Sequence, residues 1–123
     1  MLLSTEDEEG VKEMTNSGLS GPWPLTTDKI DEIVREIRSG NYLLGRQGDK
    51  FYYRYTGRAD VSLNLRLKQW VGKYPDFKAD YASSPKAAYE KECWIYHNLE
   101  PADNKVHPDK GDNTDWKCPI CGK

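Results

Sequence analysis

The stretch GNYLLGRQGDKFYYRYTG, residues 40 to 57, decides the fold of this 123-residue chain. Two segments rich in aromatic and aliphatic residues flank the turn-like QGDK, a pattern that predicts two antiparallel strands joined by a short loop. Because side chains alternate between the faces of a strand, we expect Phe51, Tyr53 and Tyr55 on one face of the second strand. Tyr42 and Leu44 share a face of the first strand.

A helix is predicted before this hairpin. The segment KIDEIVREIRS, residues 29 to 39, places apolar residues at the i, i+3, i+4, i+7 spacing of an amphipathic helix. Thr27-Asp28 can cap its start, and Gly40 ends it.

Two further helices and a third strand are predicted after the hairpin. Asp60 or Ser62 can cap a helix with an apolar stripe, and Arg66 lies at the edge of that stripe. DFKADYA, residues 76 to 82, reads as a strand. Ser84-Pro85 starts a last helix that ends near Leu99.

This order of elements predicts a small α/β (α+β) domain over residues 25 to 104. The economical arrangement is a three-stranded antiparallel sheet flanked by helices. Residues 1 to 24 combine an acidic run with the turn formers TNSGLSGPWP and have no periodic apolar face. We therefore expect them to form an acidic, disordered tail.

Charge and composition limit the classes of function. The net charge is −2, but residues 40 to 92 carry ten Lys and Arg against six Asp and Glu. Such a surface suits a polyanion, although it lacks the dense basic stripe of a dedicated DNA-binding module, and an ordinary solvated surface would look the same. No apolar run is long enough for a membrane span, and no signal-peptide pattern is present. Three cysteines, an odd number, favour a reducing compartment, so we expect a cytoplasmic protein with no membrane partner.

Glu92 is the most informative anomaly in the sequence. On the last helix it falls within a narrow face that is otherwise formed by Ala88, Ile95 and Leu99. A carboxylate in an apolar stripe is costly unless it meets a cation. Two interpretations stay open, a structural salt bridge with Arg66 as the candidate partner and a metal ligand.

Several positions resemble the motifs of a known family. Gly40-Asn41-Tyr42 in the first strand and Tyr55-Thr56-Gly57 at the end of the second resemble the paired motifs of the GIY-YIG nucleases. The family's remaining signature positions have counterparts, in the same order and at similar spacing, in Arg66, Glu92 and Asn104. The sequence departs from the family pattern at Asn41, where an apolar residue is usual, and at Trp70, where many members have histidine.

The resemblance implies a small α/β domain that hydrolyses DNA phosphodiesters with one divalent metal ion. Glu92 would coordinate Mg²⁺ or Mn²⁺, and Tyr55 would help to deprotonate the attacking water. Tyr42 would position water or phosphate, and Arg66 would stabilise the charge that develops on the phosphate. The supporting positions would be Gly40, Gly57, Arg58 and Asn104.

Elementary chemistry is consistent with these implied roles. Phosphodiester hydrolysis needs an activated water, a Lewis acid at the phosphate and a complementary cation. One carboxylate can anchor Mg²⁺, because this ion keeps several waters and takes other ligands from the substrate. A phenol with an ordinary pKa near 10 is a poor base, so Tyr55 would need a nearby cation such as Arg58, Arg66 or the metal.

The C-terminal segment, residues 105 to 123, predicts a second and different metal site. Cys118-Pro-Ile-Cys121-Gly is typical of a zinc knuckle, which needs two further ligands. Cys93 and His97 are four residues apart on the last helix and share a face that points away from Glu92. We expect Zn²⁺ bound by Cys93, His97, Cys118 and Cys121, with His107 as the substitute for His97. The alternative is that Cys93 is a small core residue and His97 is solvated.

Two functions follow from these observations. The first is a metal-dependent endonuclease that acts on DNA, or on RNA. The second is a catalytically silent, zinc-stapled module that binds nucleic acid or protein on the same scaffold. Either function leaves the oligomeric state undetermined.

Overall fold

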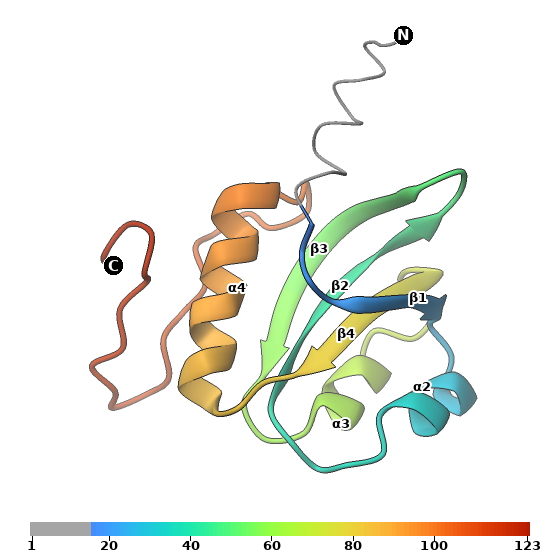
Figure 1. The fold of residues 1–123 in the computed structure, drawn as a ribbon, viewed down its shortest axis with the longest axis horizontal. Coiled ribbons are helices and arrows are strands. Elements are labelled where there is room, and N and C mark those ends of the chain that lie inside the picture. The colour runs from blue at the N-terminus through green and yellow to red at the C-terminus, as the bar shows by residue number, and fades with distance from the viewer. Residues whose placement is uncertain (1–15) are drawn as a thin grey trace, which may run out of the picture.

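Four strands and three helices make up the regular structure of residues 16–123. A computed structural model describes these residues, in which the strands β1 (Ser20–Pro24), β2 (Gly40–Gln47), β3 (Phe51–Ala59) and β4 (Asp76–Tyr81) make one antiparallel sheet. The strand order is β1-β4-β2-β3, so β3 is an edge strand. Helices α2 (Thr27–Ile33) and α3 (Leu63–Lys68) cover one face and α4 (Pro85–Leu99) the other (Figure 1). The predicted small α+β fold is confirmed.

The sheet has four strands, so the prediction of three is wrong. The missed strand is β1, which lies within the stretch assigned to the tail and pairs with β4, with an irregularity between Ser20 and Trp23. Its sequence SGPWP does not suggest a strand, because proline lacks the N–H donor that pairing between strands uses. An edge strand can accommodate proline, since one side of it needs no partner. The acidic run itself falls on residues 1 to 15, outside the described residues.

Helix α2 is shorter than predicted. It ends at Ile33, with Val34 as its C-cap, although the apolar spacing continues to Ile37. Ile30 and Val34 reach the core, whereas Ile37 is 81% exposed. The chain leaves the helix here in order to enter β2, and the backbone N–H of Glu36 donates to the Tyr81 hydroxyl.

A β-bulge in the β2–β3 hairpin changes which face Tyr55 occupies. Leu44 pairs with Tyr55, but the next residue, Gly45, pairs with Tyr53, so β3 carries one extra residue. Phe51 and Tyr53 pack on the face of the sheet that α4 covers. Tyr55 packs on the opposite face, against the hydrophobic cluster that contains Tyr42. The prediction that all three aromatic residues share a face is therefore wrong for Tyr55.

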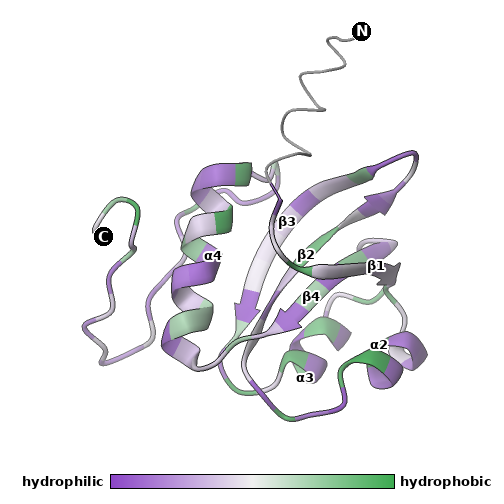
Figure 2. Ribbon diagram, viewed as in Figure 1, coloured by the Kyte–Doolittle hydropathy of each residue, from purple (hydrophilic) through white to green (hydrophobic). Residues whose placement is uncertain are grey.

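The predicted starts of α3 and α4 are confirmed. The Ser62 side chain caps α3 and the Ser84 side chain caps α4, which begins with Pro85. Figure 2 shows apolar residues of α2 and α3 next to the sheet and a hydrophilic tip on the β2–β3 hairpin. Among residues 16–123, no helix has the length and apolar character needed to cross a membrane.

Candidate functional site

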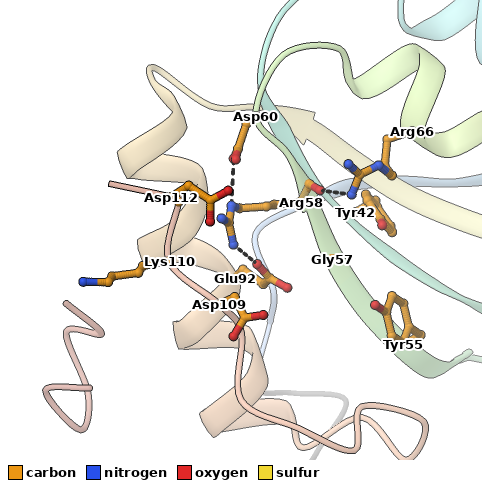
Figure 3. Close-up of a pocket in the computed structure, with 11 residues that line it drawn as sticks. Tyr42, Tyr55, Gly57, Arg58, Asp60, Arg66, Glu92, Asp109, Lys110 and Asp112 are labelled. Atoms are coloured by element: carbon orange, nitrogen blue, oxygen red, sulfur yellow. Dashed lines mark hydrogen bonds and ion pairs between the residues drawn. The ribbon is translucent and has the colours of Figure 1, made fainter. Parts of the chain in front are cut away.

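An open pocket of about 300 Å³ lies at the β3 edge of the sheet. Elements from distant parts of the sequence surround it, namely β2, β3, α3, α4 and the C-terminal segment (Figure 3). Its lining residues are Tyr42, Tyr55, Gly57, Arg58, Asp60, Arg66, Glu92, Asp109, Lys110, Gly111 and Asp112.

The four residues expected at the centre of the site all line this pocket. Each comes from a different element: Tyr42 from β2, Tyr55 from β3, Arg66 from α3 and Glu92 from α4. They therefore lie around one concave surface and are not dispersed in separate parts of the core. Their chemical roles remain predictions.

Tyr42 is buried and held by its neighbours. Its hydroxyl accepts a hydrogen bond of 3.0 Å from Trp70 Nε1, and the residue is 1% exposed. Burial raises the pKa of the Tyr42 phenol to about 12, against the opposing effects of Trp70 and Arg66. Gly57 is the cross-strand partner of Tyr42, and a Cβ there would collide with the Tyr42 phenol. The glycine thus gives the phenol room to reach the pocket.

Tyr55 is half-buried against Trp70, with 4.7 Å between the ring centroids. Burial and the nearby Glu92 carboxylate raise the pKa of the Tyr55 phenol, and Arg66 lowers it only in part. The phenol is therefore protonated at neutral pH and can donate a hydrogen bond into the pocket. Trp70 occupies the position where the resembled family often has histidine, and here it supports both tyrosines.

Arg66 contributes a guanidinium to the pocket. It is exposed, and its Nη1 donates to the Arg58 carbonyl oxygen at 3.1 Å. Among residues 16–123, no carboxylate forms an ion pair with Arg66. Its remaining guanidinium donors can therefore bind a phosphate oxygen.

Glu92 forms a salt bridge with Arg58. The prediction of Arg66 as the candidate partner is therefore wrong. Arg58 Nη1 lies 2.8 Å from Glu92 Oε1, and Arg58 Nε lies 2.7 Å from Asp60 Oδ1. The guanidinium also stacks over the Tyr89 ring at 5.0 Å. Burial raises the pKa of the Glu92 carboxyl, and Arg58 opposes that shift. Arg58 thus compensates a carboxylate that is only 8% exposed.

Two of the expected supporting residues lie outside the pocket. A Cβ on Gly40 would lie 2.6 Å from the Asp80 carbonyl oxygen, so this glycine serves strand packing. Asn104 binds both backbone groups of Thr56, with its Oδ1 2.9 Å from the Thr56 nitrogen and its Nδ2 3.0 Å from the Thr56 oxygen. It thereby fixes the backbone next to Tyr55.

Sequence reasoning missed the pocket wall formed by residues 109 to 112. Three of its members are charged, Asp109, Lys110 and Asp112. This wall and the β3 residues that line the same pocket are about fifty positions apart in the sequence, and no periodic pattern predicts that they meet. The sole hint is the proximity of this wall in sequence to His107.

A separate group of four possible metal ligands lies on the other side of α4. One ligand atom from each of His97, His107, Cys118 and Cys121 lies within 4.8 Å of every other. Two nitrogens and two sulfurs at this separation could hold a metal ion such as zinc.

The two histidines are presented as ligands. His97 Nε2 is buried and has no hydrogen-bond partner among the described residues. His107 Nδ1 lies 2.8 Å from the Pro108 carbonyl oxygen, which can only accept, so Nδ1 carries the proton and Nε2 is left with a lone pair. That Nε2 lies 3.4 Å from Cys121 Sγ. Such an outer hydrogen bond is how metal-bound histidines are oriented.

Cys118 has the environment of a thiolate ligand. Burial opposes ionisation, but the backbone N–H groups of Cys121 and Ile120, together with His107 and Cys93, lower the pKa of the Cys118 thiol to about 6. These two N–H groups lie 3.5 and 3.4 Å from the sulfur.

The group differs from the predicted set in one member, because His107 takes the place of Cys93 and His97 remains. Cys93 is fully buried in a cluster with Tyr89 and Cys118, and Trp116 packs against this cluster. Burial raises the pKa of the Cys93 thiol to about 12, which keeps it neutral. The shared helical face did not decide the ligand, because the Cys93 side chain packs in the buried cluster with Tyr89, whereas His107 reaches the other three ligand atoms. It is the small core residue of the alternative interpretation.

Comparisons with known proteins give no information on either site. No protein-family model, no curated protein and no solved structure matches the chain.

Proposed function

We propose that the protein is a metal-dependent nuclease that hydrolyses phosphodiester bonds in DNA, with RNA as the alternative substrate. The observation that carries this proposal is the meeting of Tyr42, Tyr55, Arg66 and Glu92 in one open pocket. These are two phenols, an unpaired guanidinium and a buried carboxylate. Such a set can bind a phosphodiester and position a water beside it.

The charge of the pocket supports a requirement for a cation. Its lining carries three cationic side chains and four carboxylates, and Arg58 is already engaged by Asp60 and Glu92. A phosphodiester would add further negative charge. A divalent cation bound by the second oxygen of Glu92 would balance the substrate, and Mg²⁺ accepts sites with a single protein carboxylate. We therefore propose Mg²⁺ or Mn²⁺ as this cation.

The residues of the pocket would divide the work as follows. Arg66 binds a non-bridging phosphate oxygen and stabilises the charge that grows there. The Tyr55 phenol holds its proton and donates it to a hydrogen bond, which orients the substrate or the attacking water. Tyr42, fixed by Trp70, forms the floor against which the phosphate is placed. The cation, when bound, supplies Lewis acidity and lowers the pKa of water.

The His97, His107, Cys118 and Cys121 group is proposed to bind a structural Zn²⁺. All four positions are filled by protein atoms, as in structural rather than catalytic zinc sites. Such an ion would fasten the C-terminal segment to α4. Zinc measured well below one equivalent in protein purified without chelators would contradict this part of the proposal.

A silent binding module is the second candidate. The ion pair between Arg58 and Glu92 satisfies the carboxylate without a metal, and the raised pKa of the Tyr55 phenol makes it a poor base. A protein of this kind would bind nucleic acid more weakly as salt increases but would not cleave it.

Cleavage assays with matched variants separate the two candidates. Plasmid, branched and single-stranded DNA are incubated with Mg²⁺ or Mn²⁺ and wild-type protein, Glu92→Gln or Tyr55→Phe. Each variant is expected to slow cleavage on the order of 100-fold. Glu90→Gln on α4 and Tyr52→Phe on β3 lie outside the pocket lining and serve as controls. Cleavage that both pocket variants leave unchanged would refute the nuclease proposal.

A further inference from the structure

The C-terminal segment reaches the pocket with few ties to the rest of the fold. The polar contacts of the His107 and Thr114 side chains stay within this segment, with Pro108, Cys121 and Gly111 as their partners. The segment is held by the buried Pro108, by the packing of Trp116 on Tyr89 at 5.8 Å, and by the possible metal group. His107, a member of that group, lies two residues before the pocket wall of residues 109 to 112.

The wall that this segment forms is acidic toward the pocket. Figure 3 shows Asp109 and Asp112 on the side of Glu92 and Arg58, whereas the Lys110 side chain extends away. Of the four carboxylates that line the pocket, two therefore belong to the C-terminal segment, where Asp109 and Asp112 follow His107 by two and five positions. Without the wall, the body of the pocket offers Asp60 and Glu92, both already paired with Arg58.

We propose that the metal bound by His97, His107, Cys118 and Cys121 controls the cation affinity of the pocket, because it holds the Asp109–Asp112 wall in place. Metal occupancy on one side of α4 thereby sets the electrostatic potential on the other side. The inference rests on the proposed cation-binding role of the pocket. It adds that the protein binds its second cation tightly only when the first metal is present, which is a positive coupling between two sites.

Cation binding can be measured without any cleavage assay. Tb³⁺, a hard oxygen-seeking probe, is titrated into zinc-loaded protein, and its luminescence is excited through the aromatic residues that surround the pocket. The component lost in Glu92→Gln reports the pocket. Removal of two aspartates near a multivalent cation is expected to weaken this binding about fivefold to tenfold. The same weakening is expected for Cys121→Ser, which breaks the metal group at an exposed residue.

Matched variants keep the test decisive. Asp109→Asn combined with Asp112→Asn removes the charges and leaves the metal group intact, whereas Asp115→Asn removes an exposed charge of the same segment that is not part of the pocket lining. The inference is supported if the double variant and Cys121→Ser both weaken Tb³⁺ binding while Asp115→Asn does not. Unchanged binding in Cys121→Ser or in the double variant overturns it, as does the absence of any component that depends on Glu92.

Failure of this inference and failure of the proposed function give different results. Wild-type protein that cleaves DNA, with Tb³⁺ affinity unchanged in Cys121→Ser, refutes the coupling alone. Weakened Tb³⁺ binding in both variants without any cleavage by wild type supports the coupling and refutes the nuclease proposal.

Discussion

The two sides of α4 bury polar atoms in opposite ways. On one side, Glu92 is compensated by Arg58 within the protein. On the other, His97 Nε2 is buried without a partner among the described residues, beside three further ligand atoms. The first arrangement is complete without an added ion, whereas the second leaves a buried ring nitrogen without a partner among the described residues. A buried polar atom without a partner is thus a stronger indication of a metal site than a buried charge that is already paired. The His/Cys group is therefore better supported as a metal site than the Glu92 pocket.

The largest expected effect on stability is at the His/Cys group, the side of α4 where a buried nitrogen has no partner among the described residues. Cys118→Ala removes a buried ligand, and we expect loss of about one equivalent of zinc and of about 3 to 4 kcal/mol in the free energy of unfolding. The measurement is metal content by mass spectrometry of the native protein, together with chemical denaturation. The conservative control is Lys117→Ala, an exposed neighbour. Equal stability of Cys118→Ala and wild type would remove the distinction between the two sides.

On the other side of α4, loss of either partner of the Arg58–Glu92 ion pair should destabilise the protein. Glu92→Ala leaves the largely buried guanidinium of Arg58 with Asp60 as its remaining carboxylate partner, and we expect a destabilisation of about 2 to 3 kcal/mol. Arg58→Met together with Glu92→Met removes both charges and should cost less than either single change. Denaturant unfolding measures Glu92→Ala, the single variants Arg58→Met and Glu92→Met, and the double variant. A double variant less stable than both single ones would show that the pair contributes more than mutual compensation.

The pocket should also set an alkaline limit on stability. The pKa of Tyr42 is about 12 in the folded protein, above its ordinary value of about 10. The folded state therefore holds this proton more tightly than the unfolded state. The stability that the neutral phenol provides is complete below pH 10 and is lost as the pH rises toward 12, by about 2 kcal/mol. Tyr42→Phe should show a smaller decline when unfolding is followed against pH, because burial also raises the pKa of Tyr55 and of Tyr74, and an equal decline in both proteins would contradict it.

The smallest expected effect lies at Asn104, which stabilises β3 on the pocket side. Asn104→Ala removes two hydrogen bonds to the Thr56 backbone, and we expect a loss of about 1 kcal/mol because water can replace them at the sheet edge. Thermal unfolding measures it. Asn98→Ala, whose exposed side chain binds only the preceding turn of α4, is the control. A loss larger than that of Glu92→Ala would show that Asn104 matters more to the fold than the buried ion pair does.

Local signals in the sequence predicted the local structure well. Alternation and the QGDK turn located β2 and β3, and the serine caps with Pro85 located α3 and α4. β1 was missed because its pairing with β4 is non-local and its two prolines suggest a loop. The bulge was missed because it is a property of strand register, which residue type alone does not report.

The candidate sites show the same limit. The order and spacing of the motif residues were enough to select Tyr42, Tyr55, Arg66 and Glu92, and all four line one pocket. The choice between Cys93 and His107 depended on the path of the C-terminal segment, and helical periodicity contains no information about that path. The acidic wall depended on the same path.

The bulge between Leu44 and Gly45 has a consequence for how the protein tolerates change in length. It separates the hairpin tip from the pocket, since the alternation of side chains along β3 shifts by one residue between Tyr53 and Tyr55. Residues inserted at Gly48 or Asp49 would lengthen the loop and leave Tyr55 facing the same way. Deletion of Arg54 would remove the bulge and place Tyr53 directly before Tyr55, and regular alternation would then keep these two side chains on opposite faces, as they are now. The tip of this hairpin is therefore the place to attach a probe or a fused domain.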